Sequence, residues 1–74
     1  MDRIPLLEDC NFYTYRIDDG RFIGRVREFR DLRTRPRANA LDASDEIITH
    51  TRNKIANLTA AVALVAIQQR NRRP

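Results

Sequence analysis

Residues 12–27 read Phe-Tyr-Thr-Tyr-Arg-Ile-Asp-Asp-Gly-Arg-Phe-Ile-Gly-Arg-Val-Arg, and this stretch decides the fold. Aromatic and β-branched residues, which favour strands, stand on both sides of the Asp18-Asp19-Gly20 segment. Asp-Gly is a frequent turn in a hairpin because both residues tolerate a positive φ. The stretch therefore predicts a β-hairpin.

The pairing of the two strands follows from the length of the loop. With Asp19 and Gly20 as a two-residue loop, Asp18 lies opposite Arg21, and the later pairs are Ile17 with Phe22, Tyr15 with Gly24 and Tyr13 with Val26. This register places on one face Tyr13, Tyr15, Ile17, Phe22, Gly24 and Val26. It places on the other face Phe12, Thr14, Arg16, Ile23, Arg25 and Arg27. A slip of one residue would exchange the two faces.

A third strand is predicted over Leu32–Ala38, where arginine occupies every second position. Pro36 lacks the N–H that a sheet ladder needs, so this strand should lie at an edge or end near Pro36.

A helix is predicted from near Ala43 to about Gln69, with Asp42 as its N-cap and acidic residues in its first turn. An apolar stripe at helical spacing contains Ser44, Ile47, Ile48, Thr51, Ile55, Leu58, Val62 and Val65. A fourth strand over residues 59–69, after a break near Asn57, is the alternative for the second half.

These elements indicate an α+β fold, a three-stranded antiparallel sheet with one amphipathic helix packed on one face (βββα) and a helical C-terminal extension. We divide the chain into an irregular arm over residues 1–11, a βββα domain over 12–58 and an extension over 59–74. The predicted core contains Tyr13, Tyr15, Ile17, Phe22, Val26, Leu32, Ile47, Ile48, Ile55 and Leu58.

Composition limits what the chain can be. Its 74 residues hold one small domain, and 14 Lys+Arg against 10 Asp+Glu give a net charge of +4. A single cysteine excludes an internal disulfide, which suits a reducing compartment. The sequence has no apolar run long enough to cross a bilayer and its start does not resemble a signal peptide, so we expect a cytoplasmic protein without a membrane contact.

The extension differs from the rest of the helix because Ala60–Ile67 is apolar on all sides. A chain of this size can hardly bury such a segment by itself. We therefore expect a homodimer, a higher oligomer or a partner protein. The expected interface residues are Val62, Leu64, Val65 and Ile67.

Catalytic groups are sparse, and the sequence does not indicate an enzyme. His50 is the only histidine, and neither a second histidine nor a cysteine stands at metal-ligand spacing from it. Cys10 is interpreted as a packing residue. Asp42, Asp45 and Glu46 are explained by the helix start. We therefore expect no catalytic residue, no metal site and no cofactor.

The arginines form the most pronounced group. In the predicted register one face of the hairpin carries Phe12, Arg16, Arg25 and Arg27. If the third strand presents its arginines on the same side, the face also includes Arg33, Arg35 and Arg37. Guanidinium groups bind phosphates and carboxylates and stack on bases. This face is the candidate binding site for nucleic acid or an acidic partner, although an ordinary solvated sheet face is the alternative.

The order of elements resembles the HicB-like antitoxin domain, a truncated ribonuclease H-like fold. The resemblance covers residues 13–57 and rests on Tyr13–Ile17, Asp19–Gly24, Glu28–Leu32 and Asp45–Ile48 followed by Arg52 and Ile55. It implies a non-catalytic, antitoxin-like interaction module that binds a partner protein such as a HicA-like RNA-cleaving toxin. The alternative is a small nucleic-acid-binding accessory protein of phage or mobile-element type that uses the arginine-rich face. Both readings depend on the hairpin register.

Overall fold

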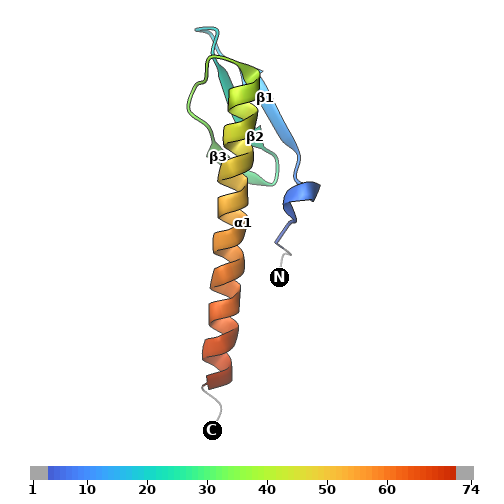
Figure 1. Cartoon of the computed structure of the whole chain (residues 1–74), viewed down its shortest axis with the longest axis vertical. Helices are drawn as coiled ribbons and strands as arrows, with labels where there is room; N and C mark the ends of the chain where they lie inside the picture. Colours follow the sequence, from blue (N-terminus) through green and yellow to red (C-terminus); the bar gives the residue numbers. More distant parts are fainter. Residues whose placement is uncertain (1–3, 72–74) are drawn as a thin grey trace.

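The computed structural model describes the backbone of residues 4–71 and the side chains of residues 4–65 (Figure 1). The strands form one antiparallel sheet in the order β1-β2-β3, followed by a single long helix. The predicted βββα fold of the α+β class is confirmed. The elements are η1 (Leu7–Asp9), β1 (Phe12–Arg16), β2 (Phe22–Val26), β3 (Phe29–Arg33) and α1 (Ala40–Asn71).

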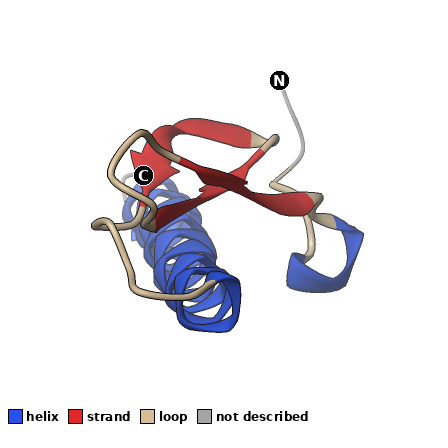
Figure 2. Cartoon of the chain, turned by 90° about the horizontal axis from the view of Figure 1, so that it is seen from above, coloured by secondary structure: helices blue, strands red, loops and turns tan. Residues whose placement is uncertain are grey.

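The first half of α1 lies across one face of the sheet (Figure 2). The core is small, and its buried apolar residues are Ile23, Val26, Ala43 and Ile47. Its largest fully buried side chains are Val26 of β2 and Ile47 and Thr51 of α1. The Thr51 hydroxyl donates to the Ile47 carbonyl oxygen at 2.8 Å, so its polar atom is satisfied inside the helix.

The hairpin register predicted from the sequence is wrong by one residue. Tyr15 pairs with Ile23, Thr14 with Gly24 and Tyr13 with Arg25. The reason is a loop of three residues, Asp18-Asp19-Gly20, closed by a hydrogen bond from the Ile17 N–H to the Arg21 carbonyl oxygen at 2.8 Å. Gly20 has a φ of 87°, as expected for a turn followed by a bulge residue in the left-handed region. The extra loop residue reverses the faces of β1.

Two residues expected in the core are therefore on the surface. Tyr13 is 47% exposed and Tyr15 is 39% exposed. Val26 and Ile47 are buried as predicted. The other predicted core residues are half-buried, namely Ile17, Phe22, Leu32, Ile48, Ile55 and Leu58.

Gly24 is the point where sheet and helix approach most closely. A Cβ atom at this position would lie 2.5 Å from the Ala43 carbonyl oxygen and 3.0 Å from the Ile47 side chain. Only a residue without a side chain permits this contact. Gly24 therefore faces the helix, and its neighbours Ile23 and Arg25 face the opposite side of the sheet.

The third strand starts and ends earlier than predicted. It runs over Phe29–Arg33, and Pro36 lies beyond it in the connection to α1. An isolated bridge between Phe22 and Arg37 extends the pairing with β2. The side-chain hydroxyl of the buried Thr34 accepts a hydrogen bond from the Gly24 N–H at 2.9 Å, in the gap between strand and bridge.

The helix begins at Ala40, three residues before the predicted start. Its N-cap is Asn39, whose side-chain oxygen accepts from the Asp42 N–H at 2.8 Å. Asp42 is inside the first turn and is not the cap. The helix continues without a break to Asn71, so the alternative of a fourth strand over residues 59–69 is wrong. In the part of the chain described, no helix is long and apolar enough to cross a membrane.

The N-terminal arm is more ordered than predicted. It contains the 3₁₀ turn η1, which lies beside α1 in Figure 1. Glu28 in the β2–β3 turn holds the end of the arm, because its two carboxylate oxygens accept from the N–H and the side-chain amide of Asn11, each at 2.7 Å.

We expect Gly24→Ala to lower the free energy of unfolding by about 1–3 kcal/mol, since the added methyl group meets a backbone carbonyl that cannot rotate away. Chemical denaturation followed by circular dichroism measures this loss. A loss below about 0.5 kcal/mol, the range of ordinary surface positions, would contradict the close approach.

Candidate functional site

The face of the sheet turned away from α1 carries an unusual set of side chains. Paired residues in antiparallel strands point to the same side, and Tyr13 pairs with Arg25, Tyr15 with Ile23, and Arg25 with Arg33. We call this surface the open face, made of Tyr13, Tyr15, Ile23, Arg25 and Arg33. Figure 2 shows α1 on the other side of the sheet. Ile23 is the buried residue of the open face, at 8% exposed.

Arg25 is at the centre of the open face because it pairs with residues of both neighbouring strands. Its Nη2 atom donates to the Arg30 carbonyl oxygen at 2.7 Å, which fixes the guanidinium at the start of β3. Its Nε atom is buried and has no hydrogen-bond partner among the described residues. The half-buried guanidinium is thus held in place before any ligand arrives.

Two shallow hollows adjoin Arg25 and Arg33. One, of about 380 Å³, is lined by Tyr13, Arg25, Val26, Arg27 and Arg30. The other, of about 310 Å³, is lined by Ile23, Arg33, Thr34, Arg35 and Pro36. Each hollow combines an apolar or aromatic surface with guanidinium groups.

Two carboxylates close to these arginines in the sequence have partners outside the hollows. Glu28 accepts two hydrogen bonds from Asn11, and Asp31 forms an ion pair with Lys54 at 2.9 Å. None of the ion pairs in the described residues involves an arginine of the two hollows. The surface therefore keeps its positive charge.

The structure brings together only part of the predicted cationic site. Arg25 and Arg33 are on the open face, and Arg27 and Arg35 line the hollows. Phe12 pairs with Val26 and faces the helix side, and Arg16 pairs with Phe22 on that same side, so both are corrections that follow from the register. Sequence reasoning missed Tyr13, Tyr15 and Arg30.

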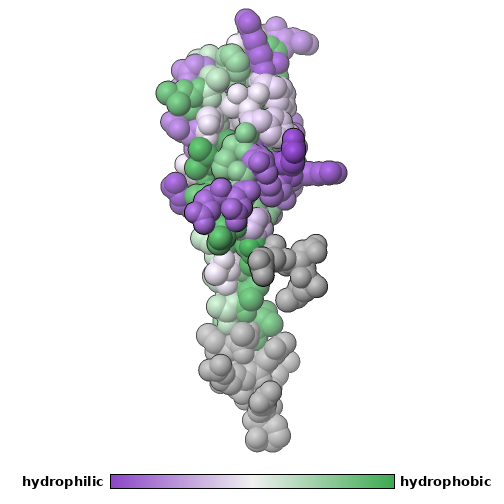
Figure 3. All heavy atoms as spheres, turned by 90° about the vertical axis from the view of Figure 1, so that its right-hand side faces the viewer, coloured by the Kyte–Doolittle hydropathy of each residue, from purple (hydrophilic) through white to green (hydrophobic). Residues whose placement is uncertain are grey.

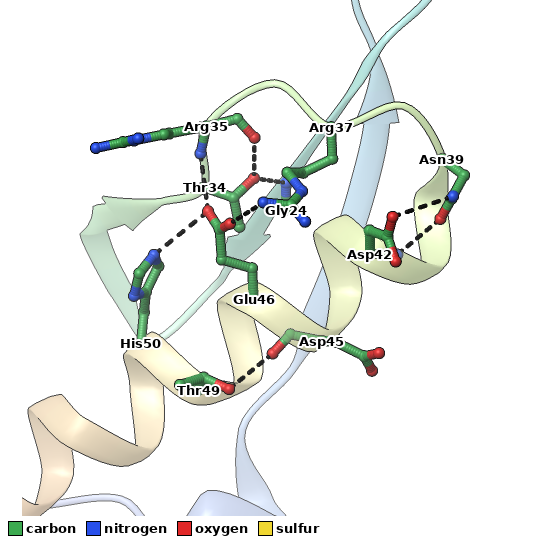
Figure 4. A network of polar contacts seen from close by, with 10 residues as sticks. All are labelled: Gly24, Thr34, Arg35, Arg37, Asn39, Asp42, Asp45, Glu46, Thr49 and His50. Carbon is green, nitrogen blue, oxygen red and sulfur yellow. Dashed lines mark hydrogen bonds and ion pairs between the residues drawn. The ribbon is translucent and has the colours of Figure 1, made fainter.

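Arg37 also leaves the predicted site, because Glu46 of α1 binds it. The Glu46 carboxylate accepts from Arg37 Nη1 at 3.0 Å and from the Arg35 N–H at 3.0 Å (Figure 4). His50 Nε2 lies 3.4 Å from the same carboxylate. Glu46 thus holds the connection between β3 and α1 against the helix. The sequence had predicted only a favourable interaction of its charge with the start of the helix.

The remaining titratable candidates do not form a reactive site. The Cys10 thiol donates to the Leu6 carbonyl oxygen at 3.3 Å. Burial, with smaller contributions from Glu28 and Asp9, raises the pKa of this thiol, which lowers its fraction of reactive thiolate. Among the described residues, His, Cys, Asp and Glu side chains nowhere gather into a group that could hold a metal ion.

The second half of α1 extends beyond the sheet (Figure 1). Of the predicted interface residues, Val62, Leu64 and Val65 are each more than half exposed. Figure 3 shows apolar atoms along this part of the helix. Ile67 lies outside the residues whose side chains are described.

Comparison with known proteins gave no match to a protein-family model, a curated protein or a solved structure.

Acid should destabilise the fold partly through Glu28. Hydrogen bonds from the backbone and side chain of Asn11 lower the pKa of Glu28, so its contribution to stability is present above the ordinary glutamate pKa and is lost as the pH falls through the lowered value. We expect the thermal midpoint of unfolding to fall on acidification below about pH 4.3. Glu28→Gln should show a smaller fall, and equal falls in the two proteins would contradict this role.

Proposed function

We propose that this protein binds single-stranded nucleic acid on the open face of its sheet. The observation that carries the proposal is the juxtaposition of the exposed Tyr13 and Tyr15 with Arg25 and Arg33 on the face of the sheet turned away from α1. Aromatic rings bind bases by stacking, and guanidinium groups bind the phosphates of the same strand.

The spacing of the two tyrosines supports a single strand as the ligand. Residues two apart on one face of a strand are separated by about 6.8 Å, so one base can stack on each ring. The arginines of the hollows lie beside them, where they can contact phosphates. Bases of a closed duplex are stacked on each other and do not offer their planes to these rings.

The first test compares binding of fluorescently labelled single-stranded RNA, single-stranded DNA and duplex DNA by anisotropy. Tyr13→Ala and Tyr15→Ala should each weaken binding to single strands by roughly 5- to 150-fold, since a stacked base contributes about 1–3 kcal/mol. The matched controls are Tyr13→Phe and Tyr15→Phe, which keep the ring. Tighter binding of the duplex, or alanine variants that bind as well as the parent, would contradict the proposal.

The second test measures how affinity depends on salt. Each phosphate contact that is lost should reduce the slope of log affinity against log salt by about 0.7 for a single strand. Arg33→Gln should show this reduction. Arg52→Gln removes the same charge from an exposed position on α1 and should leave the slope unchanged. Equal slopes for the two variants would show that net charge, not the open face, causes binding.

An antitoxin-like interaction module remains the second candidate. It is favoured by the observed order of three antiparallel strands and a helix, which is the order that the HicB-like resemblance implies. The register on which both sequence-based interpretations depended is wrong. This candidate ranks second because the observed register places tyrosines beside arginines, which favours nucleic acid, and adds nothing to the detailed resemblance. Co-expression with a small RNA-cleaving protein from a neighbouring reading frame tests it, and rescue of growth with a stable complex is the expected result.

A further inference from the structure

Residues 58–71 of α1 extend past the sheet, and we call them the projecting segment. The last contacts of the helix with β3 lie near Lys54, which binds Asp31, and a hollow between β3 and α1 reaches Asn57. At 1.5 Å per residue the projecting segment spans about 21 Å. From Leu58 to Val65 its sequence contains no charge, and Val62 and Val65 are 53% and 51% exposed.

The apolar stripe of the projecting segment continues the stripe that holds the sheet. At about 100° per residue, Leu58, Val62 and Val65 lie on the same side of α1 as the buried Ala43, Ile47 and Thr51. Ile55, Leu58, Val62 and Val65 also follow the heptad spacing of coiled coils, with β-branched residues at the first position of each repeat. The face that would receive a partner helix therefore points to the sheet side of α1.

We infer that a second copy of this chain covers the stripe, with the two projecting segments antiparallel. A parallel partner helix is excluded by the fold. Such a helix would follow the same stripe towards the N-terminus of α1, where the sheet already covers Ala43 and Ile47. An antiparallel neighbour ends where the sheet begins. Two segments of equal length then overlap completely, with their centre between Leu64 and Val65.

Charge favours the same arrangement. The antiparallel pair brings the end of one copy's helix, whose sequence includes Arg70, to the base of the other copy's sheet. At that base lie the exposed acidic residues Glu8, Asp9 and Glu28. Glu28 lies beside the N-terminal arm at this base, because its carboxylate accepts hydrogen bonds from the N–H and the side-chain amide of Asn11. A parallel pair would instead place the two helix ends that carry Arg70 together.

Sedimentation equilibrium of the full chain tests the pairing. The parent should have about twice the monomer mass of 8.7 kDa. The double variant Val62→Glu, Val65→Glu should sediment as a monomer, because it places charge in the contact. Ala63→Glu, about 130° away from the stripe, is the matched control and should remain paired. A monomeric parent, or a double variant that pairs as well as the parent, would overturn the inference.

Disulfide trapping tests the direction of the pair, in a Cys10→Ser background. Val65→Cys lies next to the two-fold centre and should link two chains under mild oxidation. Leu58→Cys should not, because its copies are about 20 Å apart in an antiparallel pair. Linking of both variants would show a parallel pair. Linking of neither, in a protein that still sediments as a dimer, would show that another surface pairs, and either result overturns the inference.

Discussion

The approach of α1 to the backbone of Gly24 is the contact on which the rest of the structure depends. Because this position has no side chain, the helix can press its Ala43 carbonyl and Ile47 against the central strand. That contact fixes which side of β2 is covered, and it directs Val26 into the core and Arg25 away from it. The pairing with β1 and β3 then determines which side chains join Arg25 on the opposite side. A small core and a charged, aromatic surface are thus two results of one close contact.

The sequence predicted the elements well and the faces of the first strand poorly. Strand-forming residues around Asp18-Asp19-Gly20 made the hairpin recognisable, and the uninterrupted helical pattern made the long helix recognisable. The register failed because Asp-Gly is compatible with a two-residue loop and, with the preceding Asp18, with a three-residue loop ending in a left-handed glycine. The tyrosines did not distinguish the two loop lengths, because a tyrosine ring can pack in a core and its hydroxyl also suits an exposed position.

The candidate site was affected by the same error. The predicted register already placed Gly24 on the side of the sheet that α1 covers, so this glycine could not reveal that its partner in β1 was wrong. With Thr14 as that partner, Tyr13 and Tyr15 fall beside the arginines. The roles of Glu46 and Arg37 could not be predicted from the sequence. Their side chains meet because of the path of the irregular connection between β3 and α1.

The uninterrupted course of α1 has a consequence for how a joined pair would engage a ligand. In the antiparallel pair the two projecting segments are related by a two-fold axis perpendicular to the helices. The tyrosine-bearing open faces would therefore lie at opposite ends of a stiff helical rod and face in opposite directions. Such a molecule could not clamp one strand with both of its surfaces. It would instead act as a divalent bridge that ties together two separate stretches of nucleic acid, with a reach set by the length of the rod.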